Sequence, residues 1–298
     1  HVVPVPYKPL SPTEEEQVVG MLRGAGGILL RSGYVTASLL DRLPALQVVA
    51  VHGTGVDPVD VPACTERGVW VTNAPSANAV AVAELTIGLM VALLRRFSDA
   101  AHQVRQHREW DAARHTGGEL GGRRLGLFGI GDIGQRVARL ASAFGMSVMA
   151  HDPGLSDEQI CTRGAIPASQ RDVFEQADVI SLHAPAIAAT RHMVNAETLG
   201  WMKSSALLVN CARGALVDEV AVAAALTEGR LGGAALDVLE GEPPDPSSPV
   251  FDAPNIILTP HMAGSTHECL QTIARVAGAD LVRVLSGLEP LNAVNQIR

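Results

Sequence analysis

Short apolar runs alternate with segments of helical spacing in the first third of the chain. The predicted strands cover residues 27–31, 47–51 and 69–72, and the predicted helices cover residues 36–43, 58–67 and 79–95. Strands that alternate with helices indicate βαβ units and therefore a parallel sheet. Residues 2–6 resemble a further strand with no βα unit before it, and the chain has no initiator methionine, so we expect that a leading segment is missing.

From residue 125 the alternation is more regular. The predicted strands cover residues 125–130, 147–151, 178–183, 206–210, 234–238 and 256–258, and helical patterns such as 133–145 and 218–229 lie between them. Six parallel strands joined by crossover helices match a doubly wound dinucleotide-binding sheet. Residues 265–286 predict a single helix, which we expect to return to the first domain.

This pattern predicts an α/β protein with two doubly wound parallel-sheet domains. A Rossmann cofactor domain, residues 95–264, is expected to be inserted in a flavodoxin-like substrate domain made of residues 1–94 and 265–298. The linkers near residues 94–122 and Gly264 would then act as a hinge. A length of 298 residues is enough for two cores, and 29 glycines with only 3% aromatic residues favour α/β over an all-β fold.

Charge and cysteine content exclude several classes of partner. The net charge of -8 and a pI near 5.7 argue against nucleic acid. The apolar stretch 79–94 is too short to span a bilayer and contains Glu84, and no signal peptide is visible, so we expect no membrane partner. The four cysteines form no CxxC pair, which disfavours structural zinc or a disulfide framework and predicts a cytoplasmic protein; they are Cys64, Cys161, Cys211 and Cys269.

The segment from Gly129 to Gly134 fits the pattern GxGxxG. It follows an apolar run and opens a helical segment, which is the context that a dinucleotide-binding turn requires. Asp152 ends the next predicted strand, where a carboxylate can accept hydrogen bonds from a ribose and repel a 2′-phosphate, so NAD is favoured over NADP. The alternative for Asp152 is an ordinary turn residue before proline. The predicted cofactor contacts in this turn are Gly129, Gly131, Asp132, Ile133 and Gly134, with Asp132 expected to face solvent.

Three polar segments follow predicted strands in the second half of the chain. They contain Arg213, Glu242 and His261. Residues just past the carboxyl ends of parallel strands converge on one crevice. An arginine can bind a substrate carboxylate, an imidazole can move a proton near neutral pH, and a carboxylate can orient that imidazole and raise its pKa. This set predicts the reduction or oxidation of a small 2-oxo or 2-hydroxy acid.

At this point the sequence resembles the D-isomer-specific 2-hydroxyacid dehydrogenase family, most closely its phosphoglycerate-dehydrogenase-like branch. The resemblance covers nearly the whole chain, and the matching segments are Val51–Asp57, Asn73–Pro75, Val82–Glu84, Gly129–Gly134, His183–Pro185, Asn210–Gly214, Asp237–Pro243 and Thr259–His261. The family implies two α/β domains with the active site in the cleft between them.

The resemblance also implies roles for single residues. Arg213 would bind the substrate carboxylate and its 2-oxo group, His261 would be the general acid/base, and Glu242 would be its partner. Asp237 would bind the nicotinamide carboxamide. The first three have simpler alternatives: a surface ion pair for Arg213, a structural role for His261, and Glu240 as the rival carboxylate to Glu242. The turn with Gly53, Thr54 and Gly55 would meet the substrate carboxylate.

Other positions have weaker claims. Arg31 and Ser32 could bind a second anionic group of the substrate, or could form a solvated strand end. His183 with Ala184 and Pro185 is expected to line the cofactor pocket, with a buried core histidine as the alternative; Cys211 and Gly264 are also predicted cofactor contacts. Trp110 and the basic residues near it predict a homodimer contact. Three histidines of this region are expected at the surface, and their spacing does not suggest a metal site; they are His102, His107 and His115.

The sequence leaves the identity of the substrate open between similar acids. The branch and Arg31 allow 3-phosphoglycerate, while hydroxypyruvate or glyoxylate reduction would use the same residues without a phosphate contact. A protein of a different class, an NADH-sensing binding protein similar to the corepressors of this family, would keep the same three residues. A formate-oxidising relative is disfavoured, because a glutamine usually replaces the carboxylate partner in those enzymes and Glu242 is present here.

Overall fold

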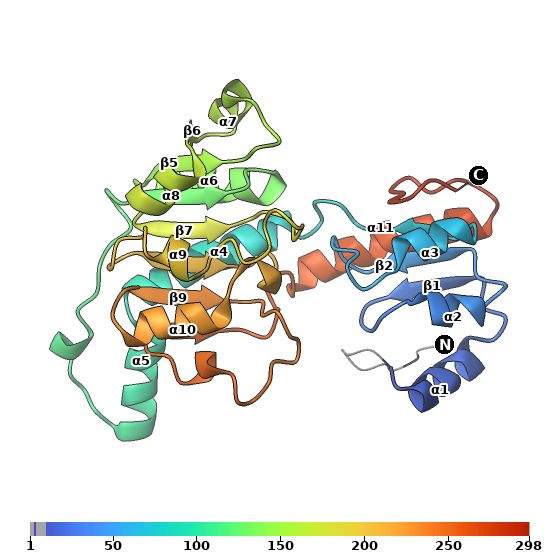
Figure 1. The fold of residues 1–298 in the computed structure, drawn as a ribbon, viewed down its shortest axis with the longest axis horizontal. Helices are drawn as coiled ribbons and strands as arrows, with labels where there is room; N and C mark the ends of the chain where they lie inside the picture. The colour runs from blue at the N-terminus through green and yellow to red at the C-terminus, as the bar shows by residue number, and fades with distance from the viewer. Residues whose placement is uncertain (1–2, 4–9, 298) are drawn as a thin grey trace. The chain divides into compact units, whose positions relative to one another are not determined.

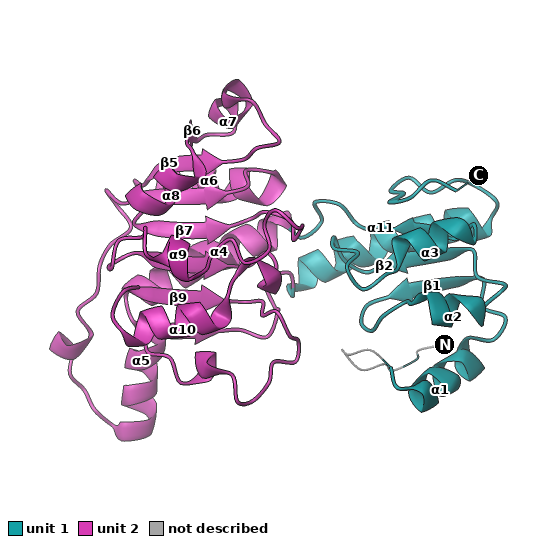
Figure 2. Ribbon diagram, in the orientation of Figure 1, with its two compact units in different colours: residues 1–78, 265–298 teal, residues 79–264 magenta. Residues whose placement is uncertain are grey.

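The computed structural model describes residue 3 and residues 10–297, and the chain divides into two compact units (Figure 2). Unit 1 contains the residues up to Asn78 together with those from Ser265 onward, and unit 2 is Ala79–Gly264. The first boundary therefore lies at residue 78 instead of the expected 94, because helix α4 (Ala79–Leu94) packs against helix α6 (Asp132–Ala143) and strand β8 (Leu207–Asn210) of unit 2. The strand expected at 2–6 falls on residues of which only Val3 is described.

Unit 1 is built on a parallel three-stranded sheet in the order β1-β2-β3 (Figure 1). Its strands are β1 (Gly27–Leu30), β2 (Val48–Val51) and β3 (Trp70–Thr72), and its helices are α1 (Pro12–Leu22), α2 (Ala37–Asp41), α3 (Val61–Glu66) and α11 (His267–Leu285). Helix α11 packs on β1 and β2. This confirms that the last long helix returns to the first domain.

The segment after α11 closes the free edge of β3. Ala293 forms an antiparallel bridge with Thr72. The buried side chain of Asn295 accepts a hydrogen bond from the Val71 amide at 2.8 Å and donates to the Val69 carbonyl at 2.9 Å. An unpaired strand edge is thereby satisfied within the unit.

Unit 2 contains a parallel seven-stranded sheet in the order β10-β9-β8-β7-β4-β5-β6. The strand order reverses between β4 and β7, which creates the switch point at which doubly wound sheets bind ligands. The six strands predicted from the sequence are all present, while β6 was not predicted because it has only two residues, one of them a proline. The strands are β4 (Arg124–Phe128), β5 (Ser147–His151), β6 (Ile166–Pro167), β7 (Val179–Leu182), β8 (Leu207–Asn210), β9 (Gly233–Leu236) and β10 (Ile256–Leu258).

Helices cover both faces of this sheet. Helices α4 and α6 (Asp132–Ala143) share one buried cluster with the strands, while α8 (Gln170–Gln176), α9 (Ala196–Leu199) and α10 (Glu219–Thr227) share the other (Figure 1). Burial on both faces explains why β7, β8 and β9 are apolar without alternation. The remaining elements are α5 (Phe97–His102), η1 (Gln103–His107), η2 (Ala113–His115), α7 (Asp157–Thr162), η3 (Gly214–Leu216) and η4 (Pro249–Phe251).

The predicted fold class, α/β with parallel sheets in two domains, is confirmed. Among the described residues, no helix is both long and apolar enough to cross a membrane.

Candidate active site

The turn between β4 and α6 has the backbone that the glycine pattern predicts. Gly129 adopts a φ of 87°, and a Cβ atom there would lie 2.7 Å from the His183 carbonyl oxygen. A Cβ atom at Gly134 would lie 2.4 Å from the Gly129 oxygen, so the helix can approach the turn only without a side chain. Gly131, by contrast, faces open space. The first turn of α6 is therefore accessible to a pyrophosphate, which its amide groups and dipole would favour.

Asp152 follows β5 and binds this turn directly. Its Oδ2 atom accepts a hydrogen bond from the Ile130 amide at 2.9 Å, and its Oδ1 atom accepts one from the Gly154 amide at 3.1 Å. Asp132 is exposed, as expected. Ile133 is half-buried in the first turn of α6.

A cavity of about 390 Å³ opens beside Asp152. Asp157 adds a second carboxylate to it, and its lining contains neither lysine nor arginine, which disfavours a 2′-phosphate. These residues fit the adenosine half of NAD. Apart from Asp152, the sequence pattern did not single them out; the lining residues are His151, Asp152, Pro153, Leu155, Asp157, Ile160, Pro167, Ala168 and Ser169.

Arg213 lies in a tightly held loop after β8. The Asn210 side chain donates a hydrogen bond to the Arg213 carbonyl at 2.9 Å and accepts one from the Ala212 amide at 3.0 Å. A Cβ atom at Gly214 would lie 2.0 Å from the Leu239 carbonyl carbon, so only glycine lets this loop contact the one that follows β9. The loop carrying the arginine is thereby packed against the loop carrying the acid.

Glu242 and His261 form a close pair. The Oε2 atom of Glu242 lies 2.7 Å from Nδ1 of His261, and its Oε1 atom accepts a hydrogen bond from the Leu239 amide at 3.2 Å. The hydrogen bond to Glu242 raises the pKa of His261; burial and the nearby positive charge of Arg213 act in the opposite direction. The His261 side chain is 54% exposed, so its ring remains accessible. The structure thus brings the predicted imidazole and acid together, with the arginine near enough to act on the imidazole.

The buried carboxylate of Asp237 organises the loop that carries His261. It accepts hydrogen bonds from the Thr259 hydroxyl at 2.6 Å and from the Met262 and Ala263 amides, each at 2.9 Å. The Asp237 carbonyl also accepts from the His261 amide at 2.8 Å. The carboxylate predicted to meet the nicotinamide therefore also holds this loop in place.

The rival carboxylate, Glu240, is engaged elsewhere. Its Oε2 atom lies 2.7 Å from Nε2 of His192, and its other oxygen pairs with Arg191. The hydrogen bond to His192 is the main reason why the pKa of Glu240 is lowered. Its amide donates to Glu219 at 2.5 Å. Of the two acids, only Glu242 pairs with His261.

His183 follows β7, beside the Gly129 turn. Its Nε2 atom lies 3.0 Å from the Ser181 hydroxyl, and its Nδ1 atom is buried with no hydrogen-bond partner. Burial lowers the pKa of His183 to about 4, which keeps the ring neutral near pH 7. The neighbouring predicted contacts differ in exposure: Ala184 and Gly264 are half-buried, Pro185 is exposed, and Cys211 is buried, which raises its pKa to about 12.

The predicted substrate contacts of unit 1 lie together at the carboxyl edge of its sheet. Arg31 is exposed and Ser32 is half-buried after β1, and the Gly53–Gly55 turn follows β2. The Thr54 hydroxyl donates to the Ala74 carbonyl at 3.2 Å and lies 3.0 Å from the Asn78 Oδ1 atom, while its carbonyl accepts from the Asn73 side chain at 2.7 Å. The turn is therefore held on the segment that follows β3.

Comparison with known proteins agrees with this geometry. Residues 87–263 match the family model described as D-isomer specific 2-hydroxyacid dehydrogenase, NAD binding domain. The chain belongs to the D-isomer-specific 2-hydroxyacid dehydrogenase family. The matched range includes the glycine turn, Asp152 and all three residues of the predicted catalytic set, so the NAD predicted from the sequence agrees with the family's cofactor.

Individual members of this family are similar over most of the chain. A D-3-phosphoglycerate dehydrogenase of Methanocaldococcus jannaschii is 39% identical over 94% of this chain and 54% of its own length. A glyoxylate reductase of Thermofilum pendens is 35% identical over 96% of this chain and 86% of its own length. A solved structure of a Thermus thermophilus protein has a TM-score of 0.87 at 37% identity and covers 96% of this chain and 90% of its own. The chain spans about half the length of the phosphoglycerate dehydrogenases that it matches.

Proposed function

We propose that this family member is an NAD-dependent oxidoreductase that transfers a hydride between nicotinamide and C2 of a D-2-hydroxy acid or the corresponding 2-oxo acid. The observation that carries the proposal is the His261–Glu242 pair at 2.7 Å, with Arg213 close enough to affect its charge. An imidazole with an orienting carboxylate can accept or donate the proton that must move with the hydride. A nearby guanidinium can bind the acid group of the substrate through two parallel hydrogen bonds.

Each residue then has a defined task. Arg213 binds and orients the substrate carboxylate. In oxidation, neutral His261 accepts the hydroxyl proton; in reduction, its protonated form donates that proton to the forming alkoxide. Glu242 holds the ring through Nδ1, which leaves Nε2 to face the substrate. Bound NAD supplies the chemistry of hydride transfer. Arg31, Ser32 and the Gly53–Gly55 turn remain predicted substrate contacts.

Replacing His261 tests the mechanism. We expect His261→Ala to lower turnover by about 10²–10⁴-fold, the usual contribution of a positioned acid or base. The affinity for NADH should be nearly unchanged, because the glycine turn and Asp152 are intact. Steady-state kinetics with a 2-oxo acid and a fluorescence titration of NADH measure the two effects. A variant with normal turnover would remove His261 from the mechanism.

The substrate is best identified with a panel of 2-oxo acids and NADH. Glyoxylate is favoured by the glyoxylate reductases that match over most of their own length, and hydroxypyruvate would use the same residues. The alternative, 3-phosphoglycerate, is favoured by the dehydrogenases named for it and by the exposed Arg31. Tight NADH binding without turnover of any acid would instead support an NADH-sensing binding protein.

Two further predictions concern the cellular form of the protein. We propose a homodimer that uses the segment around Trp110, because this side chain is 89% exposed and Phe97 in the same region is 67% exposed. Large exposed aromatic residues are typical of interfaces. The cytoplasmic location inferred from the cysteine pattern stays a prediction.

A further inference from the structure

Helix α7 contacts the glycine turn through a side chain that no sequence pattern singled out. Arg163 is the C-cap residue of this helix, and its Nη1 atom donates a hydrogen bond to the Ile130 carbonyl at 2.8 Å. We propose that Arg163 is a positioning residue for the cofactor: it orients the peptide group between Ile130 and Gly131 so that the Gly131 amide can donate to a phosphate oxygen of NAD. This role requires NAD to bind at the turn, as the proposed function does, but it does not depend on the reaction.

The carbonyl of Ile130 and the amide of Gly131 belong to one trans peptide group. Such a group is planar, so its C=O and N–H bonds point in opposite directions. A guanidinium that holds the carbonyl therefore also fixes the direction of the Gly131 N–H bond. The fixing matters here because Gly129 and Gly131 flank Ile130, and glycine permits many backbone conformations. Without the hydrogen bond, the peptide plane could turn away from the ligand.

The Gly131 amide is available to a ligand. Gly131 is the N-cap residue of α6, and the first amide groups of a helix have no acceptor within it. Among the described residues, no backbone carbonyl accepts from this amide. A Cβ atom at Gly131 would meet nothing within 4 Å, so the approach to the amide is open. The positive end of the helix dipole favours an anion at this point.

Ile130 is held at both of its backbone groups. Asp152, which follows β5, accepts a hydrogen bond from the Ile130 amide at 2.9 Å, and Arg163 donates to its carbonyl. The Ile130 side chain is buried in the apolar cluster that also contains Ile160 of α7. Helix α7 is therefore packed on the same cluster as the turn, which keeps Arg163 within reach of the carbonyl.

Helix α7 presents one face to the predicted cofactor site. Asp157, Ile160 and Arg163 follow one another at intervals of three residues, which places them on one side of a helix. Asp157 and Ile160 line the cavity that fits the adenosine half of NAD, and Arg163 reaches the turn before α6. Helix α7 lies beside β5 and β6, at one end of the sheet (Figure 1). The same helix thus contacts the predicted adenosine and pyrophosphate sites.

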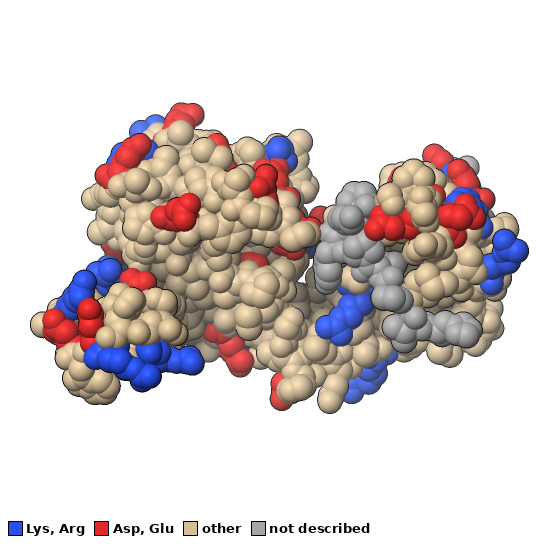
Figure 3. All heavy atoms as spheres, turned by 90° about the horizontal axis from the view of Figure 1, so that it is seen from below, with Lys and Arg blue, Asp and Glu red and all other residues tan. Residues whose placement is uncertain are grey.

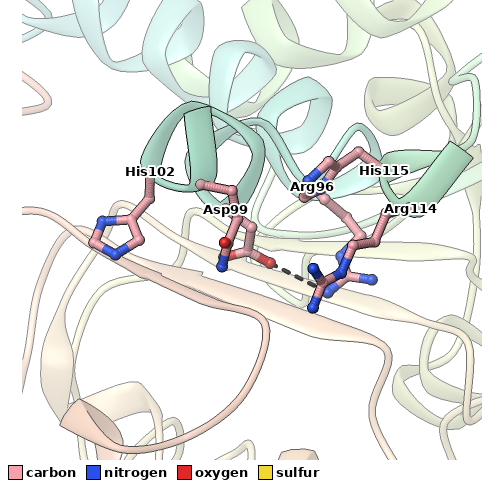
Figure 4. Close-up of a pocket in the computed structure, with 6 residues that line it drawn as sticks. Arg96, Asp99, His102, Arg114 and His115 are labelled. Atoms are coloured by element: carbon pink, nitrogen blue, oxygen red, sulfur yellow. Dashed lines mark hydrogen bonds and ion pairs between the residues drawn. The ribbon is translucent and has the colours of Figure 1, made fainter. Parts of the chain in front are cut away.

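A surface ion pair, the simpler explanation for an arginine, does not account for Arg163. Arg96 of the same unit lies 3.3 Å from Asp99, and both side chains are about half exposed (Figure 4). Figure 3 likewise shows Lys and Arg atoms beside Asp and Glu atoms at the left of the face it displays. Arg163 is half-buried and, among the described residues, its side chain binds a backbone carbonyl and no carboxylate. Its positive charge would favour a pyrophosphate nearby.

Arg163→Met tests the proposal in the full chain, because methionine keeps an apolar stem but cannot donate a hydrogen bond. We expect the Kd for NADH in a fluorescence titration to rise about tenfold, since the turn loses a charge-assisted hydrogen bond. Arg163→Lys keeps a charged donor and should bring the Kd back to within about threefold of the natural chain. The control, Arg139→Met, removes an exposed arginine of α6 and should change the Kd by less than about twofold.

A second measurement follows the Gly131 amide itself. A hydrogen bond to a phosphate oxygen moves an amide proton resonance to lower field. ADP carries the adenosine and pyrophosphate groups of NAD, so it should move the Gly131 resonance of the isotope-labelled natural chain in this direction. At saturating ADP, the movement should be much smaller in Arg163→Met and should return in Arg163→Lys. A variant that is only less stable would show the full movement once saturated.

The other outcomes decide against the proposal. An unchanged Kd in Arg163→Met, an equal loss in Arg139→Met, no recovery with lysine, or the same movement of the Gly131 resonance in Arg163→Met as in the natural chain would each overturn it. A natural chain that does not bind NADH would overturn it together with the proposed function. The expected changes in NADH binding without turnover of any 2-oxo acid would count only against the proposed function.

Discussion

Glu240 and Glu242 are separated by one residue, yet their surroundings give them different tasks. Glu240 pairs with His192 and Arg191, which lowers its pKa and keeps it ionised. Glu242 points to the ring of His261 and raises the pKa of that imidazole. The same functional group therefore forms ion pairs at Glu240 and favours the protonated form of the proposed acid/base at Glu242.

Glu242→Gln should move the pH dependence of reduction to lower pH. The imidazolium of His261 donates the proton in reduction, so activity falls as the pH rises through its pKa. In the natural chain the hydrogen bond to Glu242 raises that pKa. A neutral amide removes this effect, so the fall should begin at lower pH, and the oxidation reaction should gain its activity at lower pH as well. Profiles of kcat in both directions measure the shift.

Glu240→Gln is the matched control for this experiment. It also replaces an acid of the same loop by an amide, but Glu240 pairs with His192 and Arg191 and not with His261. We expect the pH profile of this variant to follow that of the natural chain. A Glu242→Gln profile that stays in place or moves to higher pH would refute the proposed pairing.

At the scale of elements, the sequence predicted the main strands well, because a strand covered on both faces is a continuous apolar run. It missed β6, which has only two residues, and α1, whose start is marked by a capping box between Ser11 and Glu14. The glycine turn was recognisable because any side chain at position 129 or 134 would clash with the backbone, so both positions must be glycine. The unit boundary was placed after α4, since apolar spacing shows that a helix is buried but not which sheet covers it.

The candidate site was predictable to a similar degree. Arg213 and His261 stand just past the ends of predicted strands, and the strand order places such ends at one edge of a parallel sheet. The choice of Glu242 over Glu240 came from the family resemblance, since both follow β9 and differ only in their tertiary partners.

Gly134→Ala and Gly131→Ala form a matched pair that separates the packing of α6 from cofactor binding. The added methyl group at 134 would meet the Gly129 oxygen at 2.4 Å, so we expect a loss of about 1–3 kcal/mol in the free energy of unfolding. The methyl group at 131 meets no neighbour within 4 Å, and stability should change by less than about 0.5 kcal/mol.

NADH affinity should respond to both changes, and at 131 without a loss of stability, because the methyl group would stand where the pyrophosphate approaches the backbone. Urea unfolding and a fluorescence titration of NADH give the two quantities. Full NADH affinity in Gly131→Ala would show that the cofactor does not approach this turn. Unchanged stability in Gly134→Ala would show that the helix can shift away from β4.

At the scale of the whole molecule, each unit has a buried core of its own. The core of unit 1 is closed by a segment far along the chain, since Asn295 binds the backbone on either side of Trp70. The proposed NAD contacts lie in unit 2. A ligand stabilises the part of a protein that binds it, by about 2.7 kcal/mol at a concentration 100 times its Kd. The stabilities of the two units should therefore be separable.

Asn295→Ala tests this separation by hydrogen exchange. The variant leaves the Val71 amide and the Val69 carbonyl without their partner, which should cost about 1–3 kcal/mol and speed the exchange of amides in β2 and β3. Gln296→Ala, at an exposed neighbouring position, should have no such effect. Saturating NAD should slow amide exchange in β4 and β7 of both variants. In Asn295→Ala, amide exchange in β3 should stay as fast with NAD as without it. If NAD restores the exchange of β3 as fully as that of β4, the two units unfold as one cooperative body, and the weakened edge of unit 1 is coupled to the cofactor.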